Sequence, residues 1–276
     1  YLGFIQSTSK EVIQMGILRR GVASLLAGAA LALTSLGAWA VPVTQLGFAL
    51  DASGSVSSSN YNLLRSGLNA ALAGLPVDGT IEITVLSYSS GNLTVVAPTI
   101  LTAATLPTIQ AAITSHSKSG GGTNTGGAIS GLTALMTGSA NFADAGTKSI
   151  INLATDGFPN SQAAAVTAAA AAAVAGIDAL SIEAIGSGVS SASALNDLKA
   201  IAFPGPATIL AVNSTSIPNP IGGSWVVPVS DFNALAPVLA AKVQAAVNPN
   251  PVPEPASLAL FGVALAGLAA TRRRSK

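Results

Sequence analysis

The chain has 276 residues, of which only 8% are charged, and it contains no cysteine and a single histidine. This composition argues against a zinc or copper site, which needs sulfur and imidazole ligands, and leaves ions that bind oxygen, such as Mg²⁺, Mn²⁺ or Ca²⁺. Residues 41–250 hold nine acidic and five basic residues, a charge of about −4, so they offer no basic surface for nucleic acid.

The first 40 residues have the pattern of an export signal that follows a short upstream segment. Residues 1–14 precede the first methionine, and we expect them to be upstream sequence read in frame rather than protein. Residues 15–40 then contain the positive pair Arg19-Arg20, an apolar run and the small-x-small cleavage pattern Ala38-Trp39-Ala40. We therefore predict a signal peptide over 15–40, with an uncleaved membrane anchor as the alternative.

Residues 41–247 alternate between strand-like and helix-like segments and are expected to form one domain. An exported domain without cysteine must be held together by its apolar core, and roughly 210 residues are enough for that. Continuous apolar or β-branched runs predict strands, and apolar residues at helical spacing predict helices. The expected strands are 45–50, 81–88, 93–97, 149–155, 179–185 and 208–212; the expected helices are 60–75, 106–113, 125–136, 162–175, 192–202 and 232–247.

This alternation predicts an α/β fold with a doubly wound, mostly parallel sheet and helices on both faces. The turn Ser89-Ser90-Gly91-Asn92 is short enough for a hairpin, so the segment 93–97 is expected to be an antiparallel edge strand. Serines 57–59 are candidate caps of the helix 60–75, and Gly176 is expected to end the helix 162–175. In such sheets, ligands bind at the carboxyl ends of the strands.

The segment Asp51-Ala52-Ser53-Gly54-Ser55 comes directly after the strand 45–50. One carboxylate and two hydroxyls, spaced two residues apart, place three oxygens on a glycine-containing turn, and these are ligands that a hard cation prefers. Taken alone, the segment is also compatible with a polar turn that caps the next helix.

Two later segments add to this motif. The glycine-rich loop 120–127 opens the helix 125–136, and the strand 149–155 ends on Asp156-Gly157. The three segments together resemble the von Willebrand factor A domain family, whose metal-ion-dependent adhesion site has the pattern D-x-S-x-S, a distant T and a distant D, often within T-D-G. The resemblance covers residues 41 to 247 and implies that family's fold. It also implies metal ligands at Asp51, Ser53, Ser55, Thr123 and Asp156, with Thr125 as a competing candidate in the second loop.

Such a site implies Mg²⁺, with Mn²⁺ or Ca²⁺ as alternatives, and a coordination position left for a ligand. A partner's Asp or Glu, or a uronic acid of a polysaccharide, can bind there. The resemblance thus predicts an exported, metal-dependent binding or adhesion protein. A structural protein of the extracellular matrix, whose metal site only stabilises the fold, is the alternative. In the family, binding can be coupled to movement of the last helix, here 232–247.

His116, the only histidine, is the one candidate for acid-base catalysis. A serine hydrolase needs such a base beside its nucleophile, yet the sequence has no G-x-S-x-G elbow to support it. We therefore expect His116 to be a solvated loop residue and the protein not to be an enzyme.

Residues 248–276 form a tail in three parts. Residues 248–255 are a proline-rich linker that includes Val252-Pro253-Glu254-Pro255, and residues 256–276 are an apolar segment followed by a basic cluster. This order resembles the PEP-CTERM sorting signal, which is recognised by an exosortase of Gram-negative bacteria. The resemblance implies membrane contact through the tail before processing, and a location at the cell surface or in the extracellular matrix. A permanent inner-membrane anchor is the alternative.

Overall fold

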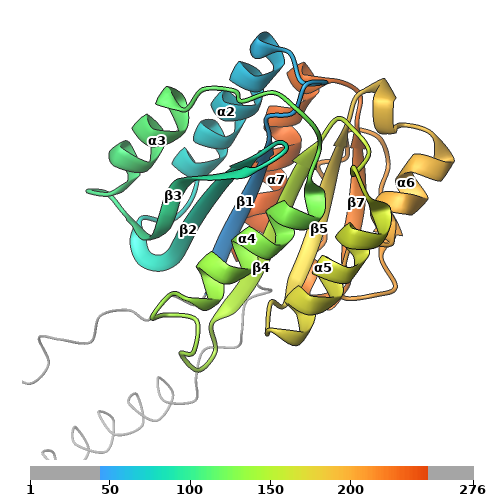
Figure 1. Ribbon diagram of the computed structural model, residues 1–276. Coiled ribbons are helices and arrows are strands. Elements are labelled where there is room, and N and C mark those ends of the chain that lie inside the picture. The colour runs from blue at the N-terminus through green and yellow to red at the C-terminus, as the bar shows by residue number, and fades with distance from the viewer. Residues whose placement is uncertain (1–43, 248–276) are drawn as a thin grey trace, which may run out of the picture. The chain divides into compact units, whose positions relative to one another are not determined.

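The computed structural model describes residues 44–247. The predicted upstream segment (1–14), signal peptide (15–40), proline-rich linker (248–255) and sorting signal (256–276) lie outside the described residues. Seven strands form one sheet in the order β3-β2-β1-β4-β5-β7-β6 (Figure 1). They are β1 (Thr44–Asp51), β2 (Asp78–Tyr88), β3 (Asn92–Thr102), β4 (Lys148–Thr155), β5 (Ala179–Ile185), β6 (Thr208–Ile209) and β7 (Trp225–Val229).

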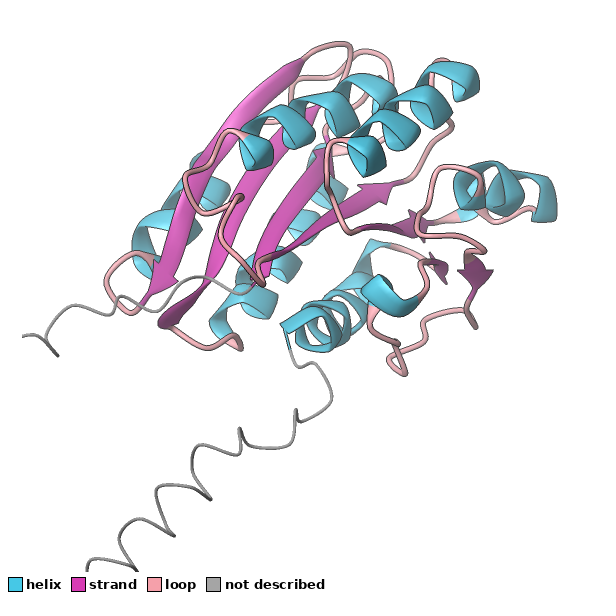
Figure 2. Ribbon diagram, turned by 90° about the horizontal axis from the view of Figure 1, so that it is seen from below, coloured by secondary structure: helices cyan, strands magenta, loops and turns pink. Residues whose placement is uncertain are grey.

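All neighbouring strands pair in parallel except β2 and β3, which are antiparallel, with β3 at one edge of the sheet. Helices cover both faces of the sheet (Figure 2). One face carries α2 (Ser58–Ala73), α3 (Leu106–Ser115) and α7 (Leu235–Val247); the other carries α4 (Thr125–Thr137), α5 (Gln162–Val174) and α6 (Ala192–Lys199). The predicted doubly wound α/β fold with an antiparallel edge strand is confirmed.

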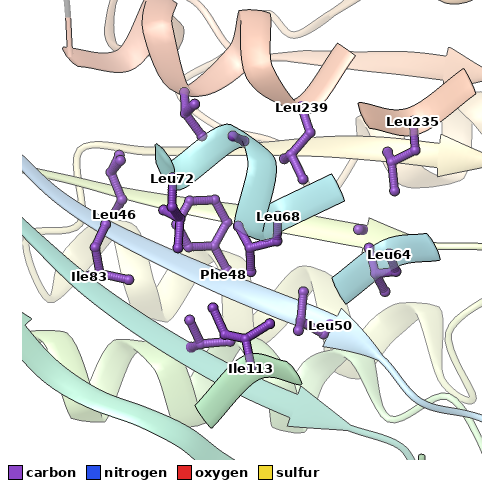
Figure 3. Packing of buried hydrophobic residues seen from close by; sticks show 14 of the residues in the cluster. Leu46, Phe48, Leu50, Leu64, Leu68, Leu72, Ile83, Ile113, Leu235 and Leu239 are labelled. Atoms are coloured by element: carbon purple, nitrogen blue, oxygen red, sulfur yellow. The ribbon is translucent and has the colours of Figure 1, made fainter. Parts of the chain in front are cut away.

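Every residue of β1 is buried, because this central strand is covered on both faces. Its side chains at positions 46, 48 and 50 join the core cluster that contains α2 and α7 (Figure 3). Toward the other face, a Cβ on Gly47 would lie only 2.4 Å from the sulfur of Met136 on α4, so glycine at this position lets the Met136 side chain pack directly against the strand. The apolar run that predicted this strand is therefore the signature of two-sided burial.

Small side chains let α5 pack closely against the sheet and α4. Its buried positions are Ala165, Ala168, Ala169 and Ala172, which recur at helical spacing. A Cβ on Gly126 of α4 would approach the carbonyl oxygen of Ala164 to 3.0 Å. None of the helices within residues 44–247 has the length and apolar character needed to cross a membrane.

The far edge of the sheet differs from the prediction in two ways. The strand expected over 208–212 is shortened to Thr208–Ile209, and β7 was not predicted at all. Pro228 lies inside β7, where a proline normally argues against a central strand. The carbonyl of Pro228 accepts the N–H of Asn213, a residue that comes after the end of β6. On the side of Asn213, β7 therefore has no strand beside it at Pro228, and the N–H that proline lacks interrupts no hydrogen bonding between strands.

Candidate metal centre

The carboxyl ends of β1 and β4 lie side by side and carry the two predicted carboxylates. These strands are parallel neighbours in which Leu50 pairs with Ala154. Asp51, the last residue of β1, and Asp156, which follows β4, therefore leave the sheet at the same edge. Parallel pairing brings together two acidic residues that are remote in the sequence.

Asp51 is buried, with 1% of its surface exposed, and both of its carboxylate oxygens accept hydrogen bonds. The backbone N–H of Ser53 donates to Oδ1 at 2.9 Å, and the hydroxyl of Thr155 donates to Oδ2 at 2.7 Å. Neither donor is charged, and the ion pairs between described residues do not include Asp51. Because burying a carboxylate without a countercharge is costly, this position favours a cation from outside the chain.

Ser53, Ser55 and Asp156 form a chain of short contacts. The Oγ atoms of Ser53 and Ser55 are 3.0 Å apart, and the hydroxyl of Ser55 donates to Oδ1 of Asp156 at 2.6 Å. Ser53 is buried, Asp156 is half-buried and Ser55 is exposed, so the chain of oxygens leads from the interior to the surface. An ion held along it is within reach of a ligand in solution.

Thr123 reaches this group from the glycine-rich loop. Its hydroxyl and that of Ser55 each lie 3.5 Å from the position that a Cβ on Gly157 would take. Two hydrogen bonds of 2.8 Å hold Thr123 there: its N–H donates to Oδ1 of Asn160, and the N–H of Asn160 donates to its carbonyl. The structure therefore brings all five predicted ligand residues to one edge of the sheet.

Backbone hydrogen bonds fasten the glycine-rich loop to the loop after β1. The N–H of Gly54 donates to the carbonyl of Gly121 at 2.7 Å, and the N–H of Gly120 donates to the carbonyl of Ala52 at 2.8 Å. Gly121 has φ of +95°, and a Cβ at this position would also lie 2.6 Å from the Oγ of Ser90. Glycine is thus needed where the loops approach each other.

Thr125, the competing candidate, lies deeper than Thr123. It is the first residue of α4 and is 1% exposed. Its hydroxyl lies near the Tyr88 side chain and has no hydrogen-bond partner within residues 44–247. Thr123 is the threonine whose hydroxyl lies beside Ser55 and Gly157.

Electrostatics at the edge also favour a cation. Burial raises the pKa of Asp156 and the charge of Asp51 raises it further, while the hydrogen bond from Ser55 and the charge of Lys118 lower it. The nearby Asp51 carboxylate thus disfavours the ionised form of Asp156. A positive ion between them would remove that repulsion.

The donor set fits a hard divalent ion. No three of His, Asp and Glu cluster anywhere in residues 44–247, so the centre consists of two carboxylates and hydroxyls. Adjacent oxygens around an octahedral ion with bonds of about 2.0–2.1 Å lie about 2.9 Å apart. The 3.0 Å between the Oγ atoms of Ser53 and Ser55 matches this spacing.

Two residues that support the centre were not singled out from the sequence. Thr155 binds Asp51, and its place directly before Asp156 was the available signal. Asn160 positions Thr123 but has no local signal, because the contact joins two loops. His116 differs from expectation: its ring packs edge-on against Tyr61, with centroids 6.1 Å apart, and burial lowers its pKa.

Together these features define a class: a doubly wound α/β domain with an oxygen-lined centre at the carboxyl edge of its sheet. The chain belongs to the von Willebrand factor type A domain family, whose sequence profile matches residues 45–219. A second profile, the PEP-CTERM protein-sorting motif, matches residues 251–274 and implies export across the envelope of a Gram-negative bacterium. Comparison with curated proteins gives no significant match.

Solved structures of the same fold come from animals and bacteria. Proximal thread matrix protein 1 from the mussel byssus, solved with a zinc-occupied MIDAS motif, is 18% identical with a TM-score of 0.57, over 74% of this chain and 48% of that one. BatB from Bacteroides thetaiotaomicron is 17% identical with a TM-score of 0.52, over 73% and 97%. The pilus adhesin SpaC from Lactobacillus rhamnosus GG in its open conformation is 14% identical with a TM-score of 0.53, over 72% and 29%. The chain thus spans about half the length of the mussel protein.

Proposed function

We propose that this protein is an exported, metal-dependent adhesion module that binds an acidic ligand through a divalent cation. The observation that carries the proposal is the buried Asp51 carboxylate, which lacks a basic partner among the described residues and lies beside the oxygens of Ser53, Ser55 and Asp156. With Thr123, these residues make up a metal-ion-dependent adhesion site.

The proposed ion is Mg²⁺, with Mn²⁺ or Ca²⁺ as alternatives. The all-oxygen donor set with only two carboxylates supports a small ion that shares its shell with water. The mussel protein of the same fold holds zinc in its MIDAS motif, which supports a divalent cation at this edge. When bound, the ion supplies a coordination position for a carboxylate oxygen of the ligand.

The proposed ligand is an acidic protein or an acidic polysaccharide. Residues 44–247 carry nine acidic and five basic residues, so the domain has a net negative charge, which repels an anionic ligand. The bound cation reverses this charge locally, which makes recognition dependent on metal. In this proposal, Ser55 and Asp156, the more exposed members of the centre, lie nearest the ligand.

The proposed location is the cell surface or extracellular matrix, after recognition of the tail by an exosortase-type enzyme. The PEP-CTERM match supports export, and the tail would contact the inner membrane before processing. We do not assign the protein a catalytic role. Turnover of generic ester or peptide substrates that is lost in His116→Gln would contradict this.

A second candidate is a structural matrix protein in which the cation only stabilises the fold. The burial of Asp51 favours it, because any ion that neutralises this carboxylate also stabilises the folded state. The two functions differ in their ligand dependence. A large Mg²⁺-dependent rise in melting temperature, with no component captured from the source organism's matrix in Mg²⁺ relative to EDTA, would support the structural role.

The direct test is calorimetric titration of the purified protein with Mg²⁺, with and without Asp51→Ala. We expect measurable binding by the unmodified protein and none by the variant, because Asp51 is the innermost carboxylate of the centre. Equal affinity in both proteins would remove this site from the proposal. Lys148→Gln, at an exposed ion pair, is a suitable control for a general effect of charge.

A further inference from the structure

Helices α2 and α3 pack side by side (Figure 1). A polar pocket of about 390 Å³ lies between α2, the last residues of α3 and the segment that follows α3. Its volume falls within the range of pockets that bind small molecules, about 300–1,000 Å³. Three of its lining residues have basic side chains: Arg65, His116 and Lys118. The others include the hydroxyls of Ser58 and Ser117.

Positive charge gathers in this pocket although the domain is acidic. Residues 44–247 contain five Lys and Arg residues, of which Lys148 and Lys242 form ion pairs with carboxylates. The ion pairs of the described residues include none of the other three, Arg65, Lys118 and Lys199. Two of these three line the pocket.

The Arg65 guanidinium is held in place by neutral groups. It donates to the backbone carbonyls of Thr114 and His116 and to the side-chain oxygen of Asn62, and lies 5.3 Å from the centre of the Tyr61 ring. Its Nε is buried without a hydrogen-bond partner in the described structure. Since none of these partners carries a negative charge, the pocket keeps a fixed positive charge.

Lys118 connects the pocket to the metal centre. Its Nζ lies 3.9 Å from the position that a Cβ on Gly120 would take, and the N–H of Gly120 donates to the carbonyl of Ala52 in the Asp51 loop. Lys118 thus lies beside the two loops that build the centre.

We propose that the pocket around Arg65 and Lys118 binds a second carboxylate of the ligand that the metal centre holds, and that this ligand is an acidic polysaccharide with carboxylates on neighbouring sugar units. The inference rests on the proposed metal-dependent function. Hydroxyl and amide side chains complete the lining, and they suit sugar hydroxyls. The one aromatic lining residue besides His116 is Tyr61, which is 1% exposed and offers little apolar surface to a peptide side chain.

The test is calorimetric titration of the full chain in Mg²⁺ with galacturonate, trigalacturonate and triglutamate. We expect trigalacturonate to bind more tightly than galacturonate and triglutamate. In Lys118→Gln, trigalacturonate affinity should fall about tenfold, the change produced by losing about 1.4 kcal/mol, while galacturonate affinity should change little. Lys118→Arg, which keeps the charge, should restore binding, and Lys199→Gln, which removes an equal charge outside the pocket, should have no effect.

Equal affinity for trigalacturonate and galacturonate would overturn the inference, as would equal losses in Lys118→Gln and Lys199→Gln. Tighter, Lys118-dependent binding of triglutamate would assign the pocket to an acidic peptide and overturn the saccharide assignment. Binding of galacturonate that persists in EDTA or in Asp51→Ala would instead count against the proposed metal-dependent function. The two failures are therefore distinguishable, because one concerns Lys118 and the other the metal.

Discussion

Three carboxylates are buried among the described residues, those of Asp51, Glu82 and Glu183, and the charges of Glu183 and Asp51 are balanced in different ways. Glu183 on β5 is fully buried and meets the ammonium of Lys242 on α7 at 2.6 Å. The same ammonium donates to the carbonyl of Ser181 and lies 5.1 Å from the centre of the Trp225 ring. Asp51, which is almost as buried, accepts hydrogen bonds from a backbone N–H and a hydroxyl, both of them uncharged.

The difference separates a structural pair from a candidate binding centre. At Glu183 the chain supplies its own cation, Lys242, and this ion pair joins the last helix to the sheet without needing a bound ion. Neutral donors alone also hold the buried Glu82, which accepts hydrogen bonds from Gln45, Ser139 and Asn141. What distinguishes Asp51 is the further oxygens of Ser53, Ser55 and Asp156 beside it, and we propose that an exchangeable outside cation completes that site. The predictions below test this distinction, from the largest expected effect to the smallest.

The largest effect is expected from Lys242→Met. This change keeps much of the side-chain volume but leaves Glu183 charged and alone in the core, which should lower the free energy of unfolding by about 3–5 kcal/mol. Urea denaturation measures it. The double variant Glu183→Gln/Lys242→Met should recover much of the loss, because the uncompensated charge is gone.

The matched control is Lys148→Met. Lys148 and Asp178 are 3.5 Å apart but their side chains are 48% and 26% exposed, so this pair should contribute at most about 1 kcal/mol. A Lys242→Met variant that loses no more stability than Lys148→Met would contradict the structural role of the buried pair.

The second prediction concerns removal of the metal. At about 100 times its dissociation constant, Mg²⁺ should raise the free energy of unfolding by about 2.7 kcal/mol relative to EDTA. The increase should vanish in Asp51→Ala and persist in Glu183→Gln/Lys242→Met, since only the first change removes a ligand. An increase of the same size in all three proteins would mean that Mg²⁺ binds elsewhere.

The third prediction distinguishes the two threonines of the glycine-rich loop. Thr123→Val should weaken Mg²⁺ binding about tenfold or more, which corresponds to losing about 1.4 kcal/mol. Thr125→Val should leave Mg²⁺ affinity unchanged, because its hydroxyl lies away from the Ser55 contact and has no hydrogen-bond partner within the described residues. Titration calorimetry that gave the opposite order would make Thr125 the ligand.

The smallest effect is expected at Asp231, an exposed carboxylate that lies outside both the ion pairs of the described residues and the proposed metal centre. Hydrogen bonds from backbone N–H groups, first that of Asn233, hold its pKa below the ordinary value. Its contribution to stability is therefore complete above the unfolded pKa, about 3.9, and is lost as the pH falls through the lower folded pKa. Urea denaturation between about pH 5 and pH 3 should show a smaller loss of stability in Asp231→Asn than in the unmodified protein. Parallel pH profiles would contradict this.

The sequence by itself determined the fold class and the local starts and ends of elements. Burial on both faces leaves a continuous apolar run, so β1, β4 and β5 were predictable, and the short turn at 89–92 made β3 an antiparallel edge strand. Ser57 was predictable as a helix start, and its hydroxyl accepts the N–H of Asn60. The donors of the Asp51 loop were also evident, because they are near neighbours in the chain.

Only the tertiary structure decided which distant groups meet. The strand β7 depends on a neighbour that ends before Pro228, and the contact of Thr155 with Asp51 depends on the pairing of β1 with β4. The ion pair of Glu183 with Lys242 and the clustering of Arg65 with Lys118 likewise join separate elements. Periodicity in a sequence reports whether a residue is buried, whereas its partner is set by how strands and helices are placed side by side in space.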